Sequence, residues 1–176
     1  NGVQQGVPFL LNGTGTYTVT VTDGNGCTST DNVTLTSTSI DWANLQWPAT
    51  GTIYLGQPHN VYGQIYVAGI TNGPGQAAGI IAQVGVNSTN TDPSTWPANA
   101  WSNATFNTQA GNNDEYTAGI GNLLSAGTYY YTFRYSLGQG CPNFYGGFNG
   151  GAWNGSSNTN GALTINAAPN ATSAVN

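Results

Sequence analysis

Alternation of apolar and polar residues is the pattern that most constrains this chain. In residues 16–22, Tyr17, Val19 and Val21 would share one face of a strand, and the threonines between them the other. No window of a dozen residues carries the i, i+3, i+4 apolar pattern of a helix free of glycine. Gly, Asn and Pro separate the alternating runs, as in short strands joined by tight turns. The sequence therefore predicts an all-β protein.

The first 38 residues predict less than a complete domain. Asp23–Gly26 has the chemistry of a hairpin turn, and Val33 and Leu35 continue the apolar face on the returning strand. A two-stranded hairpin is marginally stable in water by itself. We therefore expect another sheet to cover this hairpin, and because no such sheet precedes it we expect the cover to come from another part of an assembly.

A short apolar segment precedes the hairpin. Val7, Phe9 and Leu11 would share one face of a strand, and Pro8 removes one ladder donor, which suits an edge or added strand. This segment is a candidate strand donor. It would pair either with its own hairpin or with a neighbouring copy of the chain.

Residues 39–166 predict a second region, a β-sandwich of short strands, and 167–176 a polar tail. On the longest strand Tyr129, Tyr131, Phe133, Tyr135 and Leu137 would face inward. The eight expected strands are Ile40–Leu45, Thr52–Leu55, Val61–Ala68, Gly79–Val86, Ala104–Thr108, Glu115–Ile120, Thr128–Leu137 and Ala162–Ile165.

Two resemblances refine this expectation. The stretch GTYTVTVTDGNGCT, Gly15–Thr28, resembles the closing strands of immunoglobulin-like repeats in bacterial gliding and surface adhesins. The resemblance implies that the hairpin is the last part of an incomplete immunoglobulin-like repeat.

Residues 40–166 resemble an accessory β-sandwich module of secreted bacterial proteins. The motifs that carry this likeness are NLQWP (Asn44–Pro48), VYGQIYVAGIT (Val61–Thr71), GIIAQVG (Gly79–Gly85), GNNDEYTA (Gly111–Ala118) and GTYYYTFRYS (Gly127–Ser136). The likeness implies an extracellular, immunoglobulin-like sandwich that accompanies other activities. Where the family often has an acid after its aromatic strand, this chain has YGGFNGG, Tyr145–Gly151.

Charged residues are scarce. The chain has one Lys or Arg, six acids and a net charge of −5, and only 4% of its residues are charged, against about 25% in an average soluble domain. A nucleic-acid partner would need a basic surface, which this composition excludes. No apolar run reaches the roughly 18 residues of a membrane span, and with no signal peptide before Asn1 we expect a processed secreted chain or a piece of one.

Cys27 and Cys141 are the two cysteines. In an oxidising extracellular compartment they would form one disulfide, within a chain or between chains, or remain two free thiols. Asp23, Asn25 and Asp31 offer oxygen ligands around a Gly-rich turn and are a weak calcium candidate, because their spacing departs from that of an EF-hand loop. No other cofactor is predicted.

Trp96, Trp101 and Trp153 lie in the long and Gly-rich loops. They would serve either as a platform for sugar rings or as packing and subunit-interface residues, and we favour packing or interface. Trp42 and Trp47 read as core or edge packing. Six N-x-S/T triplets are candidate glycan acceptors, namely Asn12, Asn32, Asn87, Asn103, Asn154 and Asn170.

Catalytic residues do not converge in the sequence. His59, the single histidine, lies in a turn-like segment, and the adjacent Asp114 and Glu115 would face opposite sides of a strand. We read Asp114 as a turn residue, and Glu115 is a candidate partner for Arg134. We do not expect an enzyme.

The leading hypothesis is an extracellular or cell-surface structural subunit that self-assembles into a filament through strand donation or edge pairing. A chain without Lys lacks the commonest residue that guards strand edges, and few charges permit dense packing of copies. The alternative is a carbohydrate-binding or adhesive accessory module of a larger secreted protein, with glycans as partners.

Overall fold

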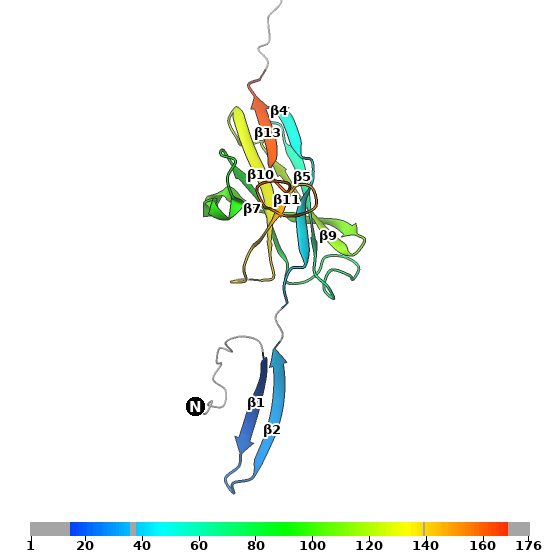
Figure 1. Ribbon diagram of the computed structural model, residues 1–176, viewed down its shortest axis with the longest axis vertical. Coiled ribbons are helices and arrows are strands. Elements are labelled where there is room, and N and C mark those ends of the chain that lie inside the picture. Colours follow the sequence, from blue (N-terminus) through cyan, green and yellow to red (C-terminus); the bar gives the residue numbers. More distant parts are fainter. Residues whose placement is uncertain (1–14, 36–37, 139, 169–176) are drawn as a thin grey trace, which may run out of the picture. The chain divides into compact units, whose positions relative to one another are not determined.

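A computed structural model describes residues 15–35, 38–138 and 140–168 (Figure 1). The chain divides into two compact units, Asn1–Thr38 and Ser39–Asn176, which are described separately. Strands make up almost all of the regular structure. Within the described ranges no helix has the length and apolar character needed to cross a membrane.

The first unit is the predicted hairpin. Strands β1 (Gly15–Thr22) and β2 (Thr28–Leu35) run antiparallel, and their register places Tyr17 opposite Val33. The turn is closed by the Asp23 N–H, which donates to the Cys27 carbonyl at 2.9 Å. Opposed residues share a face, so the valines and Tyr17 lie on one side of the ribbon, where Ser29 faces Val21 and Asp31 faces Val19, and the threonines lie on the other.

The second unit is a sandwich of two sheets. The larger sheet contains β4 (Thr50–Tyr54), β6 (Ile81–Asn87), β7 (Trp101–Asn103), β10 (Gly127–Ser136), β11 (Phe144–Gly147), β12 (Gly151–Ala152) and β13 (Gly161–Asn166). The smaller sheet has the order β3 (Trp42–Trp47), β5 (His59–Tyr66), β9 (Asn113–Ile120) and β8 (Thr105–Ala110). Two short 3-10 helices, η1 (Pro93–Thr95) and η2 (Ala98–Ala100), precede β7.

Strand β10 organises the larger sheet. It pairs with β6 on one side and with β13 and then β11 on the other, and β4 adds to β13 in parallel. The eight strands expected from the sequence are all present, with ends shifted by one or two residues. Strands β7, β11 and β12 were not predicted, because each is short and lies in a segment read as a loop.

The core lies between the two sheets. The predicted inward row on β10 is confirmed, since Tyr131, Phe133 and Tyr135 have no exposed surface and Tyr129 and Leu137 are partly buried at its ends. Gly63 on the facing strand β5 permits this packing, because a Cβ there would lie 2.7 Å from the Phe133 ring. Alternate residues of both sheets therefore fill the interior, as the period-2 pattern requires.

The two lateral sides of the sandwich differ. On one side β11 and β12 pack against β3, so closely that a Cβ on Gly146 would lie 2.5 Å from the Asn44 carbonyl carbon. The Trp42 indole N–H donates to the Gly150 carbonyl at 2.6 Å across the same side. On the opposite side, bordered by β7 and the end of β9, the two sheets leave a groove.

Candidate functional site

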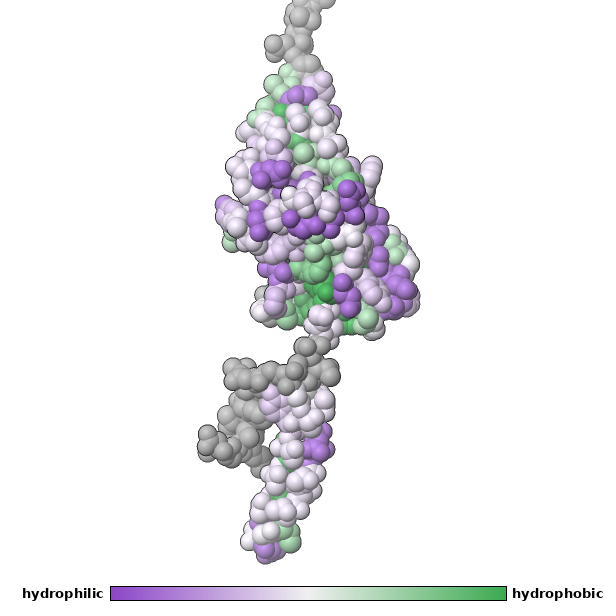
Figure 2. Space-filling view, viewed as in Figure 1, coloured by the Kyte–Doolittle hydropathy of each residue, from purple (hydrophilic) through white to green (hydrophobic). Residues whose placement is uncertain are grey.

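The hairpin carries an exposed apolar face. Val19, Val21 and Val33 expose 49%, 64% and 48% of their surface, and Tyr17 beside them is half-buried. Figure 2 shows mainly pale or purple surface on the described residues of this unit, with only small green hydrophobic patches on the face drawn. A strand face of this composition is normally covered by a second sheet. These four residues, here called the valine face, are a candidate assembly surface.

The reverse side of the hairpin is polar and internally bonded. The Thr16 and Thr34 hydroxyls lie 3.1 Å apart, and the Thr18 hydroxyl donates to Asn32 Oδ1 at 2.7 Å. Within the described part of the chain each of the two strands pairs only with the other. Among these residues the hairpin has one polar face, one face that carries the valines, and no third strand.

The candidate strand donor, with Val7, Phe9 and Leu11, lies outside the described residues, as do the candidate glycan acceptors Asn12 and Asn170.

Trp96 and Trp101 are buried, so they do not form the predicted sugar platform. They are 6% and 8% exposed, their rings lie 5.6 Å apart, and Trp101 also contacts Tyr145 at 5.7 Å. The Arg134 guanidinium covers the Trp101 ring at 4.3 Å. Trp96 and Trp101 therefore pack against the sandwich, in line with the packing interpretation that the sequence favoured.

The predicted pairing of Arg134 with Glu115 is wrong. Arg134 Nε donates to Gln83 Oε1 at 2.9 Å, on the larger sheet. The Glu115 carboxylate belongs to the smaller sheet and accepts from Gln64 Nε2 at 3.0 Å and Asn107 Nδ2 at 2.7 Å. The two side chains therefore make their hydrogen bonds on different sheets.

The remaining tryptophans lie at the margins. Trp153 is half-buried, and its backbone N–H donates to the Tyr145 carbonyl at 2.8 Å. Trp42 is half-buried on β3, and Trp47 is 60% exposed at the end of the same edge strand, 5.7 Å from Tyr62. Trp42 and Trp47 are therefore edge residues, as the sequence suggested.

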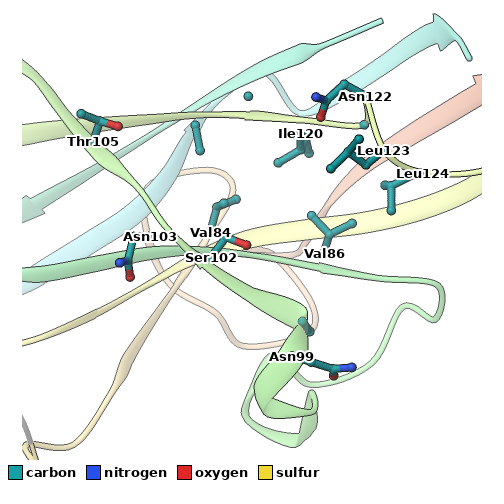
Figure 3. Close-up of a pocket in the computed structure, with 14 residues that line it drawn as sticks. Val84, Val86, Asn99, Ser102, Asn103, Thr105, Ile120, Asn122, Leu123 and Leu124 are labelled. Carbon is teal, nitrogen blue, oxygen red and sulfur yellow. The ribbon is translucent and has the colours of Figure 1, made fainter. Parts of the chain in front are cut away.

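The groove on the open side of the sandwich has a volume of about 390 Å³. Val84 and Val86 of β6 rise from one sheet and Ile120 of β9 descends from the other (Figure 3). Leu123, in the turn after β9, is 92% exposed at the border of the groove. Sequence reasoning missed this site, because three distant segments form it and no sequence pattern indicates that they meet.

The border of the groove is polar and uncharged. Asn99 of η2 lies at one border and Asn122 of the turn after β9 at another, and Ser102 and Thr105 also line it (Figure 3). None of the fourteen lining residues is an acid, a base or a histidine. A ligand here would meet amides, hydroxyls and aliphatic surface.

The structure does not bring the calcium candidates together. Asp23 Oδ1 already accepts the backbone N–H groups of Asn25 at 2.9 Å and Cys27 at 2.8 Å. Asp31 lies on β2 opposite Val19, three residue pairs from the turn, which is about 10 Å along the ribbon. Residues 15–35, 38–138 and 140–168 contain no group of three His, Cys, Asp or Glu side chains placed for a metal ion.

Cys27 and Cys141 are free, exposed thiols that belong to different units. Cys141 Sγ donates to the Leu137 carbonyl at 3.2 Å. Neither cysteine crosslinks residues within its own unit.

Asp114 is a buried strand residue, and its predicted place in a turn is wrong. It has no exposed surface, its Oδ2 accepts the Ala77 N–H at 2.8 Å, and its Oδ1 has no partner among the described residues. Burial raises the pKa of this carboxyl, while the Ala77 hydrogen bond opposes the rise. Asp114 thus ties the segment before β6 to β9, and Glu115 faces the other side as expected.

His59 is a packing residue of the sandwich. Its Nε2 lies 3.4 Å from the Tyr131 hydroxyl, which donates to the Pro48 carbonyl at 2.7 Å, and burial lowers the His59 pKa. Burial likewise raises the pKa of Tyr116 to about 12. No nucleophile and acid flank His59 within the hydrogen bonds found in the described ranges.

Four candidate glycan acceptors are described. Asn32, Asn103 and Asn154 are exposed and Asn87 is half-buried. All four carboxamides already make hydrogen bonds, and Asn154 Oδ1 accepts three backbone N–H groups in its turn, from Ser156, Ser157 and Asn158.

No protein-family model and no curated protein matches this chain.

Proposed function

We propose that this chain is an extracellular structural subunit that assembles with copies of itself through its N-terminal hairpin. The observation that carries the proposal is the exposed valine face of a two-stranded ribbon whose strands pair with no third strand among the described residues. Pairing an edge with a strand of another copy would supply backbone hydrogen bonds and cover the valines. A repeated contact of this kind that does not close on itself generates a filament.

The composition supports the same role. Only 4% of the residues are charged, so packing of copies would desolvate few charges. The edges of the hairpin carry threonines, which favour strand pairing, and no lysine, which would oppose it. The role is non-enzymatic and secreted or cell-surface.

The alternative of a carbohydrate-binding or adhesive module does not draw support from Trp96 and Trp101, because both rings are buried. It keeps one observation in its favour, which is the uncharged groove between the sheets.

Sedimentation velocity over a range of concentrations, with negative-stain microscopy, tests the proposal. Replacing Val19, Val21 and Val33 by Thr keeps strand propensity and shape but removes the apolar face. We expect the wild-type chain to form polymers and this triple variant to remain monomeric. The matched control replaces Thr16, Thr20 and Thr30 on the reverse side by Ser and should polymerise normally. A wild-type chain that stays monomeric at millimolar concentration contradicts the proposal, as does a valine variant that polymerises like the control.

A further inference from the structure

The groove combines an aliphatic floor with unused polar side chains. The side chains of Asn99, Ser102, Thr105 and Asn122 form no hydrogen bond with any other described residue, whereas the Asn103 amide oxygen accepts from Gln83 Nε2 at 3.1 Å. The Asn154 amide, by contrast, caps its own turn. The fold therefore leaves a set of donors and acceptors free around one hollow.

Uncharged amides and hydroxyls define what such a hollow can bind. Each Asn carboxamide has two donors and an acceptor, and each hydroxyl donates and accepts, so together they match a ligand rich in hydroxyl groups. Val84 and Ile120 at the base of the groove are almost completely buried, so Val86, Leu123 and Leu124 supply the aliphatic surface that matches the C–H faces of a sugar ring. An anionic ligand would find no basic residue in the lining, and the only basic side chain of the protein is stacked on Trp101.

We propose that this groove is a binding site for a neutral oligosaccharide. Its volume of about 390 Å³ falls at the small end of the roughly 300–1,000 Å³ typical of small-ligand sites. The site lies on the sandwich unit, whereas the proposed assembly surface lies on the hairpin, so this inference goes beyond self-assembly and does not depend on it.

A strand from a second copy is the competing occupant. Strand β8 begins opposite Thr117, so β9 residues Ala118–Ile120 have no partner on that side. This open stretch is three residues long and would give an added strand only a few hydrogen bonds. The pocket-like hollow and its free amides fit a sugar better, and the two occupants give different experimental results.

Calorimetric titration of the full chain identifies the ligand class. The probes are soluble hexasaccharides of glucose, mannose, galactose and N-acetylglucosamine, with a galacturonic acid hexasaccharide as the charged comparison. We expect at least one neutral probe to bind with a Kd on the order of 1 mM or below. Affinity should be the same at low and high salt, because no charge lines the groove. Hydrogen exchange with the bound probe should slow in residues 84–87, 99–105 and 118–124.

Asn99→Ala and Asn122→Ala are the test variants, because neither side chain contributes to the fold. Each should weaken binding about two- to tenfold, which corresponds to one lost hydrogen bond. Asn112→Ala is the matched control: it lies at the far end of the β8–β9 hairpin, about 20 Å along the strand from Thr105, and should bind normally.

Several results would overturn the site. One is that no neutral probe binds at 10 mM, which is about ten times the expected Kd. The others are that the galacturonic acid probe binds more tightly than the neutral probes, or that a probe slows hydrogen exchange outside the groove. Slowed exchange in the groove that depends on protein concentration without sugar would assign it to a second copy instead. The valine-face variant should keep sugar binding, and the two asparagine variants should keep assembly, so failure of one proposal is distinguishable from failure of the other.

Discussion

Val21 and Val84 occupy equivalent positions in two alternating strands, yet Val21 is 64% exposed and Val84 is 3% exposed. Both strands place apolar residues on one face and polar residues on the other. In the sandwich a second sheet covers the apolar face, and Tyr131, Phe133 and Tyr135 are completely buried against it. In the hairpin no second sheet is present among the residues that the structure describes. The alternating pattern specifies a face, and what packs against that face decides whether it is buried.

The difference has an energetic consequence. Complete burial of one Val or Leu side chain contributes about 1.5–3 kcal/mol, and the hairpin gains only part of this at three valines. A two-stranded ribbon with so little burial is marginal in water, whereas the sandwich has a continuous core. If the hairpin assembles as proposed, its stability depends on the partner copy, whereas the sandwich is held by its own core.

Amide hydrogen exchange of the dilute, monomeric chain is the most direct way to break this comparison. We expect β5, β9 and β10 to exchange at least about a thousandfold more slowly than β1 and β2, since core strands open only with global unfolding. Assembly should then slow exchange in β1 and β2 selectively. Equal protection of the two units in the monomer would show that the hairpin is covered by its own chain.

Truncation of one apolar side chain in each unit sharpens the comparison. Phe133→Ala should lower the free energy of unfolding of the sandwich by about 3–5 kcal/mol, because the ring has no exposed surface and stacks on Tyr135. Val33→Ala in the hairpin should change the free energy of unfolding of the chain by less than about 0.5 kcal/mol. Urea denaturation of the monomers measures both, and a similar loss in the two variants would place Val33 in a core.

Much of the architecture could be predicted from the sequence, because its signals are local. The hairpin, the eight longer strands and the inward row of β10 follow from alternation and from Gly and Asn turns. Strands β11 and β12 could not be predicted in the same way. They are four and two residues long. The stretch from Tyr145 to Ala152 contains most of both strands, and five of its eight residues are glycine or asparagine, so no alternation of apolar and polar residues is visible.

The candidate sites were harder to predict, because distant segments create them. Asp114 follows two asparagines and a glycine, which read locally as a turn, but Ala77, 37 residues earlier in the chain, buries it and supplies its hydrogen bond. Burial of Trp101 likewise depends on Arg134 and Tyr145. Exposure of an aromatic residue in a loop cannot be inferred from the loop alone.

Asp114 should give the sandwich a pH dependence. The folded state raises the pKa of this carboxyl above its usual 3.8, so it holds the proton more tightly than the unfolded chain does. The stabilisation that protonated Asp114 provides is complete when the pH is below the pKa of the unfolded chain. It is lost as the pH rises through the higher pKa of the folded state. Stability should therefore fall across this window.

Asp114→Asn tests that dependence. The new amide keeps an oxygen for the Ala77 N–H and places an N–H₂ group where Oδ1 has no partner, across the strand pair from Gln109, whose Oε1 also lacks one. We expect the variant to be about 1 kcal/mol more stable at pH 7 and to lose the slope. Thermal unfolding between pH 3 and pH 8 measures both, and an unchanged slope would assign the pH dependence to another group.

The cysteines should matter least, and equally little in both units. Cys27 lies beside the hairpin turn and Cys141 follows β10, and both side chains are exposed. In Cys141→Ser the hydroxyl can replace the thiol as donor to the Leu137 carbonyl. Each single Ser variant should therefore unfold within about 0.5 kcal/mol of the wild-type chain under reducing conditions. If Cys27→Ser instead abolishes assembly under oxidising conditions, copies are joined through a disulfide at the hairpin, and the valine face is not sufficient to hold them together.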